Sequence, residues 1–105
     1  MIADAPALLD VAHFDMMTGA DGALQSEVAG LFRGQVEQWR ALLTPEGPGW
    51  RDAAHTVKGS ARGIGLWPLA EACELAERAS AEEAKAALTA LHARLDEALL
   101  ALAAY

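Results

Sequence analysis

The sequence predicts an all-α fold, an antiparallel up-down-up-down four-helix bundle with an additional short N-terminal helix. The chain has 105 residues and is 53% hydrophobic, with many Ala and Leu and few aromatics, a composition that favours helices. Its apolar residues recur at the helical period through four long segments, and no segment is a strand candidate. The breaks between these segments are about three to six residues long, and short connections favour antiparallel neighbours.

The first two helices are expected at 7–18 and 22–43. Two glycines in residues 19–22 break the first helix, and Asp21 is a suitable N-cap for the second. The helical period of the second helix predicts an inward stripe with one polar member. That stripe consists of Leu24, Val28, Leu31, Phe32, Gln35, Trp39, Leu42 and Leu43.

Three further helices are expected at about 48–64, 68–79 and 81–103. Two prolines and two glycines in residues 44–49 mark the loop before the first of them. Gly65 is a natural residue to end that helix, and Pro68 is a natural residue to begin the next. Ser80 and Glu83 have the spacing of a capping box, which opens the last helix. The inward stripe of the last helix consists of Leu88, Leu91, Leu95, Leu99 and Leu102.

The helix at 48–64 places a histidine on the side away from the core. At roughly 100° per residue, its apolar residues gather about 200° from His55. Arg51, Lys58 and Arg62 lie within about 60° of His55, and Gly59 lies about 40° to the other side. An exposed imidazole is therefore expected among three cations and beside a residue without a side chain. The apolar stripe consists of Trp50, Ala53, Ala54, Val57, Ala61 and Ile64.

This arrangement suits the transfer of a phosphoryl group through histidine. Neutral imidazole is a nucleophile near neutral pH, because its pKa is about 6.5. A phosphoryl group on the ring adds dianionic charge, which cations one turn away can hydrogen-bond and screen. Gly59 clears the surface so that the backbone of another protein can come close.

The same stretch resembles the phosphoacceptor box of the histidine-containing phosphotransfer (HPt) domain family, the relay module of multi-step two-component signalling. The family pattern is His-x-x-Lys-Gly, then five residues, then Gly. The matching residues here are His55, Lys58, Gly59 and Gly65, followed by Leu69, Cys73 and Glu77 downstream. Two residues depart from the pattern: Gly63 replaces a common Asn, and Ala76 replaces a common Leu. Gly63 removes a side chain close to His55, which bears on partner preference.

The resemblance implies that His55 is the phosphoacceptor and attacks through Nε2. It would take the group from a phosphoaspartate on one receiver domain, as in a hybrid histidine kinase, and pass it to a response-regulator receiver. The Mg²⁺ that such transfers need would belong to the receiver. No metal or other cofactor is therefore expected on this chain, because it lacks a suitable acidic cluster near His55. The chain is also expected to have no kinase activity of its own.

The neighbours of His55 receive roles in the same interpretation. Lys58, Arg62 and Arg51 are the candidate phosphate-stabilising residues, although Asp52 or Glu46 could occupy Arg51. Gly59 is the candidate point of partner approach. Leu66 is either a helix-end packing residue or part of an apolar docking patch, and the sequence leaves both open.

Composition narrows the partners and the setting. The net charge of −7 argues against nucleic acid as a partner. The one cysteine, Cys73, leaves no internal disulfide and is predicted to be buried. No basic start with an apolar run marks a signal peptide, and no apolar run approaches the ~18–20 residues of a membrane span. We expect a single domain over 1–105, monomeric and cytoplasmic.

Two other interpretations remain. In the dimerising phosphoacceptor domain of a histidine kinase, an acidic residue usually follows the histidine and a proline comes a few positions later. Here Thr56 follows, and the next proline is Pro68. A plain helical adaptor would bind its partner with His55 incidental, and would take up no phosphate. His13 and His92 have no cation or ligand neighbours at useful spacing and are expected to be ordinary residues.

Overall fold

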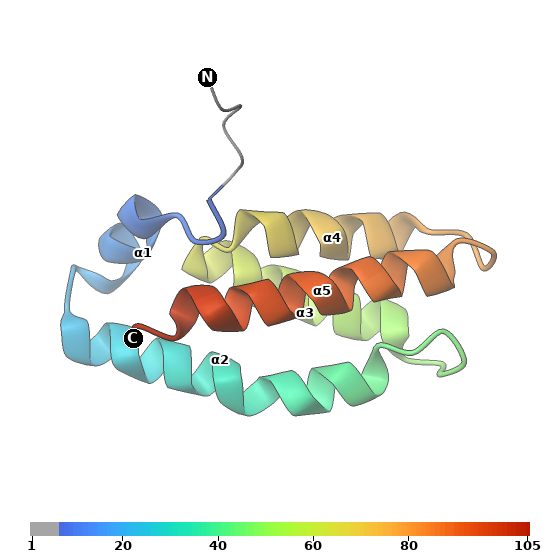
Figure 1. Cartoon of the computed structure of the whole chain (residues 1–105), viewed down its shortest axis with the longest axis horizontal. Coiled ribbons are helices and arrows are strands. Elements are labelled where there is room, and N and C mark those ends of the chain that lie inside the picture. The colour runs from blue at the N-terminus through green and yellow to red at the C-terminus, as the bar shows by residue number, and fades with distance from the viewer. Residues whose placement is uncertain (1–6) are drawn as a thin grey trace, which may run out of the picture.

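The computed structural model describes residues 7–105 and arranges them as a helical bundle (Figure 1). Residues 1–6 of the expected 1–105 domain lie outside the described residues. The helices are α1 (Val11–Thr18), α2 (Gly22–Leu42), α3 (Trp50–Ile64), α4 (Trp67–Arg78) and α5 (Ala84–Leu102). The four long helices run up, down, up and down, and α1 lies across one end, so the predicted fold class is confirmed. Within residues 7–105, each helix is too short or too polar to cross a membrane.

Most helix boundaries follow local signals in the sequence. The Asp21 side chain accepts the backbone N–H groups of Ala23 and Leu24 at 2.9 and 3.2 Å, which caps α2 as predicted. Gly65 ends α3 with a left-handed φ of 100°, also as predicted.

Two helices begin at least three residues later than predicted. The first begins at Val11 and not at residue 7, because the Asp10 side chain accepts the His13 N–H at 3.0 Å and caps the chain there. The last begins at Ala84 and not at residue 81. Ser80 and Glu83 do exchange the two capping-box hydrogen bonds, at 2.9 and 3.2 Å, but residues 81–83 form a turn.

The buried face of α3 matches its predicted stripe, but the prediction for α2 is partly wrong. Phe32, Trp39 and Leu43 are buried, whereas Leu24, Leu31 and Leu42 are 39%, 62% and 50% exposed. The core instead receives the neighbouring edge of α2, which consists of Gln25, Ala29, Phe32, Val36 and Trp39.

Hydrogen bonds to α1 explain why the polar residue Gln25 can lie on the buried edge of α2. The Gln25 side-chain amide donates to Asp15 Oδ1 at 2.7 Å and to Thr18 Oγ1 at 3.1 Å. Both acceptors belong to α1, so Gln25 is buried with its donors satisfied and joins the two helices. The leucine edge of α2 is left at the surface as a result.

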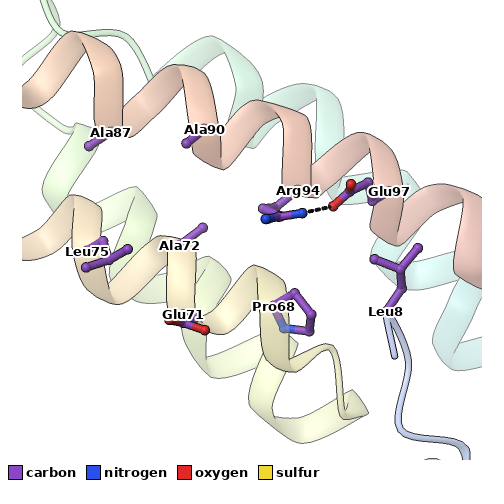
Figure 2. A pocket seen from close by; sticks show the side chains of 9 residues that line it. All are labelled: Leu8, Pro68, Glu71, Ala72, Leu75, Ala87, Ala90, Arg94 and Glu97. Atoms are coloured by element: carbon purple, nitrogen blue, oxygen red, sulfur yellow. Dashed lines mark hydrogen bonds and ion pairs between the residues drawn. The ribbon is translucent and has the colours of Figure 1, made fainter. Parts of the chain in front are cut away.

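Helices α4 and α5 are neighbours, and a hollow of about 540 Å³ lies between them where small residues face each other (Figure 2). Ala72, Ala87 and Ala90 lie along it, and Leu75 borders it, whereas Glu74 and Glu77 of α4 turn towards α3. Cys73 is buried as predicted, and burial raises the pKa of its thiol to about 12. The thiolate is therefore disfavoured at neutral pH, and Cys73 acts as a small apolar core residue.

Candidate functional site

His55 lies in the middle of α3 with its side chain 69% exposed. The core-facing residues of α3 occupy the other side of the helix, which confirms that the imidazole faces solvent. Its Nδ1 atom lies 3.1 Å from Glu77 Oε2, on α4. Among the described residues, no side chain or backbone group hydrogen-bonds the opposite ring nitrogen, Nε2. The ring is thus held at one nitrogen and open at the other.

Glu77 is held in turn by Lys58. The Lys58 ammonium lies 2.5 Å from Glu77 Oε1 and 2.8 Å from Glu74 Oε2, and the lysine side chain is only 11% exposed. The expectation that the Lys58 side chain lies in solvent is therefore wrong, while its role towards a phosphoryl group stays a prediction. The helical wheel of α3 could not show this, because both carboxylates come from α4.

These contacts keep all three groups ionised. Burial alone would raise the pKa of the Glu77 carboxyl, but ion pairing with Lys58 and the hydrogen bond to His55 outweigh it, and the pKa is lowered. Hydrogen bonding to Lys58 likewise lowers the pKa of Glu74. The same two carboxylates raise the pKa of Lys58. An ionised carboxylate only accepts hydrogen bonds, so the proton shared with Glu77 resides on His55 Nδ1.

The turn between α3 and α4 sets this register. Leu66 lies at the turn, and residues equally far on either side of it face each other. His55 is eleven residues before Leu66 and Glu77 is eleven after it, while Lys58 is eight before and Glu74 eight after. The antiparallel hairpin therefore brings each pair together. The sequence-based set lacks Glu74 and includes Glu77 only as a downstream match of the family pattern, and this counting is the signal that could have placed both at the site.

Leu66 itself is fully buried, with 0% exposure. Of the two roles left open by the sequence, the structure supports helix-end packing. A docking patch needs exposed apolar surface, which Leu66 does not offer. Its assignment to partner approach is therefore corrected.

Arg51 also has a structural contact that the sequence did not predict. Its guanidinium donates to the backbone carbonyls of Glu77 and Ala79, both at 2.7 Å, and lies 4.2 Å from the centroid of the Trp50 ring. It thus caps the carbonyl end of α4, where helix acceptors are otherwise unpaired. The expectation that Arg51 stabilises a phosphoryl group does not fit this geometry.

Arg62 and Gly59 remain at the surface beside His55. The Arg62 side chain is 57% exposed, and its guanidinium lies 3.9 Å from Glu74, which also pairs with Arg78 at 2.9 Å. A Cβ atom added at Gly59 would meet nothing within 4 Å, so open space lies above this residue. Both residues are available to a partner that approaches His55.

The other two histidines hold backbone carbonyls. His13 Nε2 lies 3.2 Å from the carbonyl oxygen of Gly63, and its ring makes an edge-on contact with Trp67. His92 Nε2 lies 2.8 Å from the carbonyl oxygen of Leu43. These contacts give both histidines structural roles.

The carboxylates of α4 contact different members of the site. The sequence predicts no acidic cluster suitable for a metal near His55; α4 brings Glu77 to His55 and Glu74 to Lys58. Lys58 pairs with both carboxylates. Within residues 7–105, no group of three or more His, Cys, Asp or Glu side chains is arranged to hold a metal ion.

Comparisons with known proteins agree on one family. The sequence model of the Hpt domain matches residues 33–105. Among solved structures, the chain is similar to the histidine phosphotransferase ShpA from Caulobacter crescentus, with 41% sequence identity and a TM-score of 0.81. That match covers 94% of this chain and 90% of the other. No curated protein sequence matches the chain.

Proposed function

The chain belongs to the Hpt domain family and serves histidine phosphotransfer in a two-component phosphorelay, and we propose that His55 is its phosphoacceptor. The proposal rests on the orientation of the His55 imidazole, which Glu77 fixes through one ring nitrogen. His55 is exposed on α3, with Nδ1 hydrogen-bonded to Glu77 and Nε2 directed to no protein partner among residues 7–105. His13 and His92, in contrast, use their Nε2 atoms to hold backbone carbonyls.

Glu77 prepares the imidazole for attack. Because the carboxylate accepts the hydrogen on Nδ1, the lone pair of the neutral ring lies on Nε2. Attack by this atom forms a bond between Nε2 and phosphorus, and the bond between phosphorus and the aspartate oxygen of the receiver breaks. The hydrogen stays on Nδ1, so the ring becomes a phosphorylated imidazolium and the receiver recovers its carboxylate.

Reversal of the same step delivers the group to a second receiver. The carboxylate of the second receiver attacks phosphorus, the bond to Nε2 breaks, and the ring returns to neutral imidazole. Glu77 faces the ring in both directions and balances the positive charge that develops on it. The Mg²⁺ required for the transfer belongs to the receiver in this proposal.

The cations have separate tasks. Lys58 keeps Glu74 and Glu77 ionised and offsets part of their negative charge, so that the approaching phosphoryl group does not meet two free carboxylates. Arg62 is exposed at the edge of the site and meets the rim of the receiver. Gly59, which has open space above it, allows the receiver to approach His55 closely.

The partners follow from this chemistry. We propose the receiver domain of a hybrid histidine kinase and that of a response regulator, both in the cytoplasm. The domain would act as a monomeric phosphoryl carrier without kinase activity of its own. Sedimentation tests the monomer, because the alternative of a dimerising kinase domain requires a dimer.

The decisive experiment is incubation with a receiver domain that has been phosphorylated beforehand with acetyl phosphate. The wild-type chain is expected to gain an acid-labile, base-stable phosphate, His55→Gln none, and the matched control His92→Gln as much as wild type. Incubation with ATP alone should label none of them. Phosphate on His55→Gln would place the acceptor elsewhere, and an unlabelled wild type across a panel of receivers would favour the adaptor interpretation.

A further inference from the structure

The surface around His55 has two unlike flanks. The flank towards α4 is charged, with Glu74, Glu77 and Arg62 in one network. The flank towards α2 carries Leu31, which is 62% exposed although it belongs to an apolar stripe. A receiver that reaches His55 must cover part of this surface, so the difference bears on how it docks.

Gly59 and Gly63 leave α3 bare on successive turns. Both are exposed, and a Cβ atom at either would meet nothing within 4 Å. Packing among residues 7–105 therefore gives no reason for glycine at these positions, each of which costs a helix about 1 kcal/mol relative to Ala. Two missing side chains four residues apart form a groove along the helix, and a ridge of side chains from another helix fits such a groove.

A hollow of about 260 Å³ adjoins this bare strip. It lies between α2 and α3, next to Gly63 along the helix, and its volume is several times the ≈30 Å³ that one water molecule occupies. There is room for one large apolar side chain. The residues that line it are uncharged: Val28, Leu31, Phe32, Gln35, Ser60 and Ile64.

We propose that Gly63 is a specificity-determining residue, selecting receivers that place a bulky apolar side chain of a docking helix in this hollow. The inference rests on the proposed function. Around α3, Gly59 and Gly63 lie between His55 and the lining residues Ser60 and Ile64, so a receiver in contact with Nε2 can reach the hollow across the two glycines. The carbonyl oxygen of Gly63 lies 3.2 Å from His13 Nε2, and this contact fixes the backbone at the end of the bare strip away from His55.

A side chain at position 63 would stand at the edge of the hollow. It would obstruct a receiver that carries a bulky residue there and spare a receiver that carries a small one. Selection would thus act by steric exclusion in addition to apolar contact. Because the hollow is uncharged, this selection should depend little on salt, unlike the contacts of Arg62.

The test measures transfer from isolated receiver domains, phosphorylated beforehand with acetyl phosphate, to Gly63→Leu and Gly63→Asn. The matched control is Gly34→Leu, since Gly34 is an exposed glycine of α2 with equally open space above it. For the preferred receiver we expect Gly63→Leu to raise KM about tenfold, equivalent to about 1.4 kcal/mol, with kcat within about twofold. Gly63→Asn should change the ranking of receivers, and Gly34→Leu should match wild type.

Each other outcome separates the two proposals. Transfer to wild type with an unchanged KM for folded Gly63→Leu would overturn the role of Gly63 and leave the phosphoacceptor intact. A fall in kcat alone would show that position 63 acts on His55 and not on docking, which also overturns the inference. Absence of transfer to wild type from every receiver would instead remove the proposed function. Circular dichroism checks that each variant is folded, and Ser60→Leu, which fills the hollow directly, should raise KM in the same way.

Discussion

The hydrogen bond between His55 and Glu77 decides which ring nitrogen meets a partner. Imidazole has two nitrogens of similar basicity, and in water the hydrogen exchanges between them. A carboxylate at 3.1 Å from Nδ1 removes this ambiguity and leaves the lone pair of the neutral ring on Nε2. In the proposed transfer, the reactivity of His55 therefore depends on a residue from the next helix.

Substitution of Glu77 tests this dependence. Glu77→Ala removes the acceptor for Nδ1–H, so we expect transfer at saturating receiver to slow by about tenfold, or about 1.4 kcal/mol. Glu77→Gln keeps a neutral acceptor and should lose less. The control is Glu71→Ala, because Glu71 lines the hollow between α4 and α5 (Figure 2). Equal rates for Glu77→Ala and wild type would show that the tautomer of His55 does not limit transfer.

Substitutions of Lys58 and Arg62 should affect the transfer rate in different ways. Lys58→Ala removes the lysine that pairs with Glu77 and one of the cations that pair with Glu74, so we expect about a tenfold slower transfer at both low and high salt. Arg62→Ala removes an exposed charge, so the loss should be smaller, lie in association, and shrink as salt rises. Transfer assays at two salt concentrations compare them. A larger loss for Arg62→Ala at both concentrations would reverse the two assignments.

At the scale of elements, the α3–α4 hairpin builds the site. Leu66 fills the turn, Gly65 allows its left-handed backbone, and the register of the two helices then pairs His55 with Glu77. Arg51 fastens the far end of the hairpin by holding the last carbonyls of α4. The position of Glu77 thus depends on contacts at both ends of the hairpin.

Arg51→Ala should weaken the fold more than the chemistry. It removes two charge-assisted hydrogen bonds, so we expect the free energy of unfolding to fall by about 1.5–3 kcal/mol. The transfer rate per folded molecule should stay close to that of wild type. Urea unfolding measures the first effect, with Arg94→Ala as control, because among residues 7–105 Arg94 pairs only with Glu97 one turn away. A stable Arg51→Ala variant with slow transfer would return Arg51 to the phosphate-binding residues.

At the scale of the whole molecule, the ionic network links stability to pH. The folded pKa values of Glu74 and Glu77 lie below the ordinary 4.5, so their stabilising contribution is present above about pH 4.5. It is lost as pH falls through the lower folded values. The folded pKa of Lys58 lies above the ordinary 10.5, so its contribution is present below that pH and is lost at higher pH.

Acid unfolding followed by circular dichroism tests this linkage. Between the two limits the network should contribute fully, and wild type should lose stability below about pH 4.5. Glu77→Gln cannot ionise at this position, so its stability should fall less steeply with acid. Parallel acid curves for the two proteins would show that Glu77 contributes no linked stability.

The sequence by itself determined the helical class, the order of the helices and the exposed face of α3. These follow from short-range rules, since the spacing of Trp50, Val57 and Ile64 and the punctuation at Asp21 and Gly65 act within one helix or turn. The same local reasoning identified His55 and the open surface at Gly59. Local reasoning also predicted the capping-box hydrogen bonds between Ser80 and Glu83, but it did not predict where α5 begins.

Only the tertiary structure decided what surrounds His55. A helical wheel describes one helix, so it placed Lys58 and Arg51 in solvent, whereas α4 supplies partners for both. It likewise could not tell which edge of α2 faces the core, because the satisfied burial of Gln25 depends on α1. The physical reason is the same in each case: a charge or an apolar edge goes where a neighbouring element can satisfy it, and that neighbour is far away in the sequence.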